Sequence, residues 1–218
     1  YPNMRKDGGL KMQRAVRCIL RLPQNSEAAG EQMRRKVILF LAMSLDGYIA
    51  DKNGKIDWLT GYDCHKDGDE IYQNFIKDVD TIVMGRKTYQ QIVTELCPGQ
   101  WVYRGRNSYI VTSQPGSSSD DIHFTQEAPG RLIKRLRREK GKNIWICGGA
   151  NIAQQLIKED LIDRYHISVV PAILGQGVRL FDTAEKKLTL KFSEAREYNG
   201  ILDIIYERQP RLQQKGNL

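Results

Sequence analysis

The chain has few cysteine and histidine residues, and their spacing argues against several kinds of site. Its 218 residues include three histidines and four cysteines, which are Cys18, Cys64, Cys97 and Cys147. No Cys-X-X-Cys pair and no pair of histidines at metal-ligand spacing occurs, which argues against a disulfide framework and a structural zinc site. We therefore predict no metal site, and reduced thiols in a cytoplasmic protein.

The sequence also lacks a long apolar segment, since no run approaches the roughly 20 apolar residues that span a bilayer. The net charge is +8, but residues 1–36 contain nine Lys and Arg residues against three acidic ones, which leaves +2 for the remainder. This basic segment has no interleaved aromatic residues of the kind that nucleic-acid readers use. We predict a protein that binds neither nucleic acid nor membranes.

Residues 1–33 differ in pattern from the rest of the chain. They combine Gly8-Gly9, Pro23 and scattered arginines without a strand pattern or the apolar core of a signal peptide. We predict a basic, disordered leader over 1–33, an α/β domain over 34–209 and a short tail over 210–218. An expression leader or sequence upstream of a natural start at Met33 is favoured over a targeting peptide, because the fold signals begin directly after Met33.

Apolar runs alternate with amphipathic stretches from residue 36 onward. Continuous apolar runs predict buried strands over 37–43, 81–84, 109–112, 143–147 and 166–170. Helical spacing predicts helices over 69–79, 87–96, 129–140 and 150–159. The apolar segments 188–194 and 201–207 lie on either side of Asn199-Gly200, which predicts a closing hairpin. The fold class is therefore α/β, a mixed and mostly parallel β-sheet flanked by helices, with a C-terminal antiparallel hairpin.

Three predicted strand ends carry polar or basic groups, two of them suited to phosphate, and ligands of open α/β sheets bind at such ends. Gly85 ends a strand and is followed by Arg86-Lys87-Thr88, which offers backbone N–H groups and two cations. Gly148-Gly149 lies between a strand and a helix, where glycine lets the backbone approach a pyrophosphate. Thr112-Ser113-Gln114 follows a third strand. Each motif alone also fits an ordinary turn, but together they favour a dinucleotide with a 2′-phosphate, NADPH rather than NADH.

These motifs and their order resemble the dihydrofolate-reductase-like superfamily. TIVMGRKTY at 81–89 is similar to the strand–helix junction of dihydrofolate reductases, and IWICGGA at 144–150 is similar to their glycine-rich cofactor turn. SLDGYIA at 44–50 and VVPAILGQGVRLF at 169–181 resemble the RibD C-terminal domain family, the pyrimidine reductase domain of bifunctional riboflavin enzymes. Ala150 stands in place of the third glycine of true dihydrofolate reductases, which favours the riboflavin branch.

The resemblance implies an NADPH-dependent reductase of the 5-amino-6-(5-phosphoribosylamino)uracil reductase type, acting on a ribosylamino-pyrimidine or pterin small molecule. Dihydrofolate reductase and a catalytically inactive nucleotide-binding protein of the same fold are the alternatives. A homodimer, with an interface around Val169 to Leu174, is also implied. The residues implied to bind the cofactor are Ala42, Ile49, Gly85, Arg86, Lys87, Thr88, Thr112, Ser113, Gln114, Gly148, Gly149, Ala150, Asn151 and Ile152.

Asp69 is the candidate catalytic acid. It lies fifteen residues before Met84, the spacing of the substrate-binding acid in dihydrofolate reductases. There it would hold a pyrimidine edge and assist protonation beside the hydride acceptor. Its alternative role is to cap the start of a helix. Asp46 is a second candidate for substrate binding, although a position before Gly47 also suits an ordinary turn residue.

Four further residues are candidates for substrate binding. Arg106 stands where dihydrofolate reductases grip a substrate carboxylate, and the same position would suit a phosphate. Tyr72 and Ile76 follow Asp69 at helical spacing and are predicted either to line the pocket or to belong to the core. Ser168, within a predicted strand, is expected to hydrogen-bond Asp69 or to be an ordinary strand residue.

Overall fold

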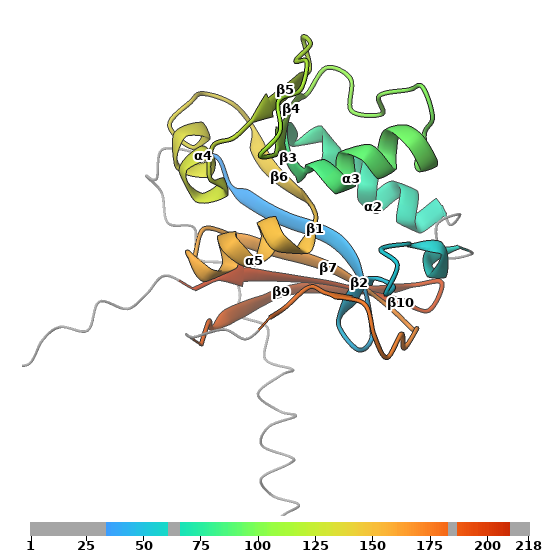
Figure 1. Ribbon diagram of the computed structural model, residues 1–218. Coiled ribbons are helices and arrows are strands. Elements are labelled where there is room, and N and C mark those ends of the chain that lie inside the picture. The colour runs from blue at the N-terminus through green and yellow to red at the C-terminus, as the bar shows by residue number, and fades with distance from the viewer. Residues whose placement is uncertain (1–33, 61–65, 183–186, 210–218) are drawn as a thin grey trace, which may run out of the picture. The chain divides into compact units, whose positions relative to one another are not determined.

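An eight-stranded, mostly parallel sheet runs through the centre of the protein (Figure 1). The computed structural model describes residues 34–60, 66–182 and 187–209, and for Lys66, Asp67 and Asp69 the backbone alone. The predicted leader 1–33 and tail 210–218 lie outside the described residues. The strands of this sheet are β1 (Val37–Ser44), β3 (Val79–Gly85), β4 (Asn107–Val111), β5 (Ile122–Thr125), β6 (Asn143–Gly148), β7 (Arg164–Val170), β9 (Leu190–Tyr198) and β10 (Ile201–Arg208).

The strand order is β5-β4-β3-β6-β1-β7-β10-β9. Neighbours from β5 to β7 pair in parallel, whereas β10 pairs antiparallel with both β7 and β9. The antiparallel pair turns at Asn199 and Gly200, and both residues have positive φ angles, as a tight hairpin of this kind requires. The predicted fold class, with its C-terminal hairpin at one edge, is confirmed.

Four helices cover the two faces of this sheet (Figure 1). They are α2 (Lys66–Lys77), α3 (Arg86–Gln91), α4 (Pro129–Leu136) and α5 (Ala150–Lys158). A 3₁₀ turn, η1 (Asp57–Leu59), precedes α2, and a π-helical turn, η2 (Ile92–Leu96), continues α3. Two short strands, β2 (Tyr48–Ala50) and β8 (Val178–Arg179), pair antiparallel in a separate sheet.

The sheet separates two apolar cores. On one face α4 and α5 pack on alternate residues of the central strands, including Leu39 and Ile146, which are fully buried. On the other face α2, α3 and η2 pack on the intervening residues, including Ile82 and Trp145. Successive strand residues point to opposite faces, so an apolar run such as 37–43 supplies both cores at once.

The predicted helix 129–140 is too long, because α4 ends at Leu136. Its apolar positions end there, and the next six residues, 137–142, carry five Lys, Arg or Glu side chains and a glycine, so nothing further can pack on the core. Strand β5 was not predicted from the sequence. It is four residues long, includes His123, and all four residues are only partly buried.

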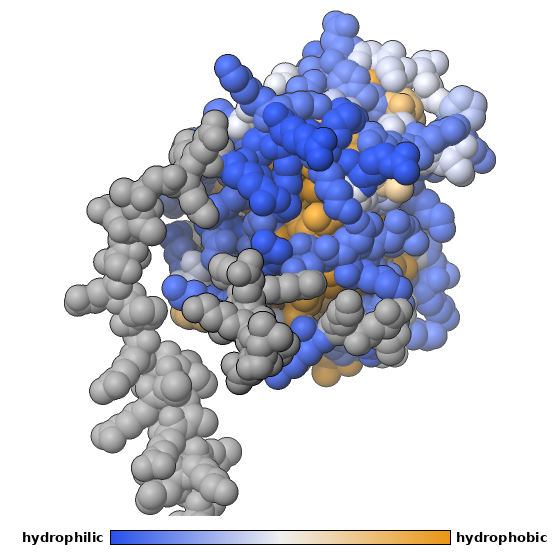
Figure 2. Space-filling view, turned by 90° about the vertical axis from the view of Figure 1, so that its left-hand side faces the viewer, coloured by the Kyte–Doolittle hydropathy of each residue, from blue (hydrophilic) through white to orange (hydrophobic). Residues whose placement is uncertain are grey.

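On the side shown in Figure 2 the surface is mostly hydrophilic, with hydrophobic residues visible between the hydrophilic ones. No helix within residues 34–60, 66–182 and 187–209 is long and apolar enough to cross a bilayer. The homodimer stays a prediction. Its proposed interface includes the loop after β7, where Ile173 is 74% exposed.

Candidate active site

A cavity of about 1100 Å³ opens at the carboxyl ends of the central strands. Its wall combines the ends of β1, β3, β4 and β6 with the starts of α3 and α5. It exceeds the roughly 300–1,000 Å³ usual for a single drug-sized ligand. The cavity therefore has room for more than one small molecule, at the place where open α/β sheets bind their ligands.

One part of this cavity, the phosphate end, consists of strand-to-helix turns. Its residues are 85–88, 112–114 and 148–152. Arg86 opens α3 directly after Gly85, where its guanidinium lies 5.9 Å from the ring centroid of Phe124 and donates a hydrogen bond to the Pro115 carbonyl. Arg86 and Lys87 are the cations among the described residues that line the cavity.

The turn Gly148-Gly149 brings bare backbone to the cavity wall. Gly148 has a φ of +146°, a conformation that favours glycine. A side chain on Gly149 would begin 3.4 Å from the Thr88 hydroxyl oxygen, which faces the same turn. Gly149 precedes the first turn of α5 without a side-chain cap. The first N–H groups of α5 are therefore suited to bind an anion such as a pyrophosphate.

Another part of the cavity, the aromatic end, is defined by Phe40, Tyr103, Trp145 and Cys147. The rings of Tyr103 and Trp145 meet edge to face, with centroids 5.3 Å apart. The Trp145 indole donates a hydrogen bond of 2.9 Å to the Phe40 carbonyl. The Tyr103 hydroxyl lies 3.6 Å from the Cys147 sulfur. Such rings, with few polar atoms, suit a flat heterocycle.

Burial changes the acidity of both polar groups at the aromatic end. It raises the pKa of the Tyr103 phenol well above its usual value, and the neighbouring Cys147 adds to the rise. Burial also raises the pKa of the Cys147 thiol to about 11, against an opposing effect of its hydrogen bond with Tyr103. Both groups are therefore neutral hydrogen-bonding groups near pH 7.

All fourteen residues implied to bind the cofactor line this cavity. Ala42 and Ile49 contribute to its wall together with the three strand-end turns of the phosphate end. They come from five separate segments of the chain. The parallel sheet brings four of them to the carboxyl ends of its strands, and Ile49 comes from β2 of the small separate sheet. The structure thus brings this set together.

The residues implied to bind substrate do not line this cavity, as far as their side chains are described. The Asp46 carboxylate accepts hydrogen bonds from the Ser44 hydroxyl and from the backbone N–H groups of Leu174 and Gly175. The Ser44 bond is the main cause of its lowered pKa, with the Gly175 and Leu174 bonds adding to it. Asp46 thus joins the loop after β1 to the loop after β7. The backbone of Asp69 lies in α2, and its side chain lies outside the described residues.

The Arg106 side chain binds backbone carbonyl groups and does not line the cavity. Its guanidinium donates to the carbonyl oxygens of Ile76 and Val79, both at 3.2 Å, where α2 gives way to β3. Ile76 is 6% exposed and belongs to the core beneath α2. Tyr72 packs against the same core, edge to face with Trp145. Of the two roles predicted for Tyr72 and Ile76, these placements correspond to the core, because α2 turns this apolar face onto the sheet.

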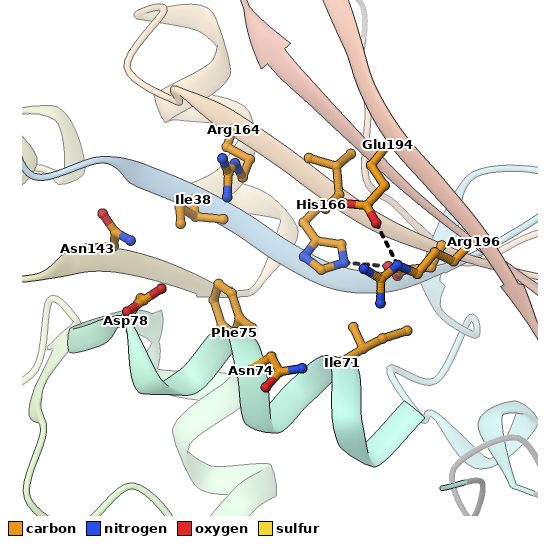
Figure 3. A pocket seen from close by; sticks show the side chains of 12 residues that line it. Ile38, Ile71, Asn74, Phe75, Asp78, Asn143, Arg164, His166, Glu194 and Arg196 are labelled. Carbon is orange, nitrogen blue, oxygen red and sulfur yellow. Dashed lines mark hydrogen bonds and ion pairs between the residues drawn. The ribbon is translucent and has the colours of Figure 1, made fainter. Parts of the chain in front are cut away.

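Ser168 belongs to a buried polar cluster with His166 and Asp203. His166 and Asp203 line a second, smaller cavity of about 210 Å³, which Figure 3 shows with His166 labelled. The Ser168 hydroxyl donates to Asp203 at 2.6 Å. The expected bond to Asp69 stays a prediction, because the Asp69 side chain lies outside the described residues. The Asp203 carboxylate also binds His166 at 2.6 Å, and the His166 ring stacks on Phe40 with centroids 4.0 Å apart. The arginines at this cavity pair with carboxylates, Arg164 with Glu207 and Arg196 with Glu194.

The aromatic end was not predicted from the sequence. Phe40 lies inside an apolar run, and Trp145 and Cys147 lie inside a second one, so both runs predict burial alone. Tyr103 lies in a loop that has no periodic pattern. Among the residues that the structure describes, no group of three or more His, Cys, Asp or Glu side chains is arranged to hold a metal ion.

Comparisons with known proteins agree with the fold and with the resemblance of the motifs. The family model for the RibD C-terminal domain matches residues 35–202. The chain is 36% identical to the protein YwjB of Bacillus subtilis (strain 168) over 179 residues, which cover 81% of this chain and 99% of that protein.

Two further relatives have names that refer to riboflavin biosynthesis. The crystal structure of a Shewanella sp. PV-4 protein assigned to riboflavin biosynthesis superposes with a TM-score of 0.72 at 29% identity, covering 80% of this chain and 99% of that one. The riboflavin biosynthesis protein RibD of Haemophilus influenzae is 26% identical, over 66% of this chain and 49% of its own length. This chain belongs to the RibD C-terminal domain family, whose pyrimidine reductase-like members have a dihydrofolate-reductase-like fold.

Proposed function

We propose that this chain is an NADPH-dependent reductase that transfers hydride to a C=N or C=O bond of a small heterocyclic substrate. We further propose a substrate of the 5-amino-6-(5-phosphoribosylamino)uracil type. Membership of the RibD C-terminal domain family supports a reductase. The observation that carries the proposal is that all fourteen residues implied to bind the cofactor line one cavity at the carboxyl ends of the strands.

The phosphate end has the donors that NADPH needs. Arg86 and Lys87 would hold the 2′-phosphate, because a doubly charged phosphate requires positive partners. The Gly148-Gly149 turn and the start of α5 would hold the pyrophosphate through backbone N–H groups. Ala42 and Ile49 would flank the nicotinamide ring, which supplies the hydride when NADPH is bound.

The aromatic end would hold the substrate beside that ring. Phe40, Tyr103 and Trp145 offer ring surfaces and exclude water, which orients a flat substrate for hydride transfer. The cavity volume of about 1100 Å³ accommodates the nicotinamide half of the cofactor together with a substrate of this size.

NADPH oxidation, followed by absorbance with the full-length chain, tests this function. The assay compares 5-amino-6-(5-phosphoribosylamino)uracil, dihydrofolate and a blank without substrate, each with NADPH and with NADH. We expect turnover with the pyrimidine and NADPH, and at least about tenfold lower kcat/KM with NADH. Turnover with dihydrofolate alone would mean that the substrate is a folate and not the proposed pyrimidine. Binding of NADPH without any turnover would favour a nucleotide-binding protein that lacks catalysis.

A further inference from the structure

The aromatic end contains one side-chain hydroxyl, that of Tyr103. Of its four residues, Phe40 has no polar side-chain atom, and the Trp145 indole is already bound to the Phe40 carbonyl. Cys147 offers a thiol, which is a weak donor. A substrate heteroatom at this end of the cavity would therefore meet the Tyr103 hydroxyl as its strongest available partner.

The position of Tyr103 is fixed by its surroundings. Its ring packs edge to face against both Trp101 and Trp145, with centroids 5.3 Å apart in each case. Its carbonyl accepts a hydrogen bond of 3.2 Å from the Arg106 backbone. The Arg106 side chain in turn binds the end of α2, so the loop that carries Tyr103 is attached to the sheet. A donor that is already oriented costs little to align with a substrate.

Resting on the proposed reductase function, we propose that Tyr103 is a catalytic hydrogen-bond donor. Its hydroxyl binds the nitrogen or oxygen of the C=N or C=O bond that is reduced, while the Cys147 thiol, 3.6 Å away, holds that hydroxyl in place. A hydroxyl has one proton and two lone pairs, so it accepts a hydrogen bond from the thiol and donates one to the substrate at the same time.

The chemistry of the step needs such a donor. Hydride transfer places two electrons and one hydrogen on the carbon, and negative charge develops on the heteroatom, which then takes a proton from water at the open mouth of the cavity. A hydrogen bond to that atom strengthens as the charge develops, so it lowers the barrier more than it strengthens substrate binding. Burial keeps the phenol protonated. Tyr103 therefore donates a hydrogen bond and keeps its proton.

The test compares Tyr103→Phe with the full-length wild-type protein, using whichever of 5-amino-6-(5-phosphoribosylamino)uracil and dihydrofolate the wild type reduces. We expect kcat to fall by about 100-fold and KM to change by less than about threefold, because the hydrogen bond acts mainly in the transition state. The dissociation constant of NADPH should stay within about twofold. The ratio of the two kcat values should be constant from pH 6 to 9, since the phenol does not ionise in that range.

Two control variants separate this role from a structural one. Tyr89→Phe removes a hydroxyl from the neighbouring aromatic cluster, where Tyr89 contacts Trp101 and Phe124, and should keep wild-type turnover. Cys147→Ser keeps a group that can hydrogen-bond to Tyr103, so its loss in kcat should stay below about fivefold.

The outcomes distinguish this inference from the function on which it rests. Tyr103→Phe that binds NADPH and turns over at the wild-type rate overturns the role of Tyr103 and leaves the reductase intact. A kcat ratio that falls toward one as the pH rises to 9 overturns the role of a permanently protonated donor. A wild-type protein that binds NADPH but reduces neither substrate, or does not bind NADPH, overturns the proposed function and this inference with it.

Discussion

The two ends of the large cavity differ in how their residues are distributed along the chain. The phosphate end consists of short contiguous segments, 85–88, 112–114 and 148–152, each directly after a strand. The aromatic end draws Phe40, Tyr103, Trp145 and Cys147 from two strands and a loop. All residues implied to bind the cofactor line the cavity, whereas none of the implied substrate residues with a described side chain does. The phosphate end is built mainly from backbone at strand-to-helix turns, which leaves a short local motif in the sequence. The aromatic end is built from side chains that are distant in the sequence, and it leaves no such motif.

The largest expected effect is a loss of NADPH affinity when a side chain is added at the Gly148-Gly149 turn. Gly149→Val places a branched side chain beside the Thr88 hydroxyl, in the space that we assign to the pyrophosphate. Gly149 has φ −82° and ψ −175°, values that valine also adopts. We expect NADPH affinity to fall by about a thousandfold, or about 4 kcal/mol, in a fluorescence titration.

Gly149→Ala is the matched control, because a single methyl group meets Thr88 at an ordinary contact distance of 3.4 Å. Its affinity should fall by less than about tenfold. Thermal unfolding of both variants shows whether they fold. A folded Gly149→Val protein with wild-type NADPH affinity would mean that the turn does not hold the pyrophosphate.

The second-largest expected effect is on stability and concerns Arg106. The resemblance implies that Arg106 binds substrate, whereas in the structure its side chain binds backbone carbonyl groups. Arg106→Ala leaves the carbonyl groups of Ile76 and Val79 without their charged donor. We expect a loss of about 2 kcal/mol in the free energy of unfolding, measured by chemical denaturation, with unchanged NADPH affinity. Arg104→Ala, an exposed neighbour in the same loop, should change stability by less than about 0.5 kcal/mol.

A stable Arg106→Ala protein whose KM for substrate rises strongly would reverse this assignment. Arg106 would then be a substrate residue, as the sequence predicts, and the difference between the two ends of the cavity would be smaller than we describe.

The smallest effect is an increase in affinity. Glu127 lines the cavity and pairs with Arg135 at 3.1 Å. Its negative charge opposes that of a 2′-phosphate, so Glu127→Gln should bind NADPH about two- to fivefold more tightly at low salt, and less so at high salt. Glu139→Gln removes the other carboxylate on Arg135, at 2.9 Å, outside the cavity wall. A calorimetric titration that gives equal gains for both variants would show that Arg135, not the cavity charge, is responsible.

The fold was largely predictable because its signals are local. Apolar runs identify β1, β3, β4, β6 and β7 of the central sheet, and Asn199-Gly200 identifies the hairpin of β9 and β10. The β2–β8 pair was not predictable, because it joins Tyr48 to Arg179 from distant parts of the chain. The buried bonds of Asp203 to His166 and Ser168 depend on the register between β10 and β7, which no local pattern specifies.

The aromatic end was not predictable for the same reason, because it depends on contacts between distant parts of the chain. An apolar run shows that a strand is buried, but the face to which Phe40 or Trp145 points follows from strand pairing. Tyr103 reaches Cys147 only because Arg106 and two tryptophan rings fix its loop. The motifs implied to bind the cofactor need no such information, since a glycine between a strand and a helix is itself a local feature that suits phosphate binding.

The most direct test of the central claim is a titration of NADPH and NADH, followed by tryptophan fluorescence, in the wild type and in Arg86→Ala, with Arg104→Ala as the control. We predict that the wild type and the control bind NADPH at least about tenfold more tightly than NADH, and that Arg86→Ala loses this preference while its NADH affinity is unchanged. Equal affinities for the two cofactors in the wild type, or binding of neither, would contradict the assignment of the cavity to NADPH.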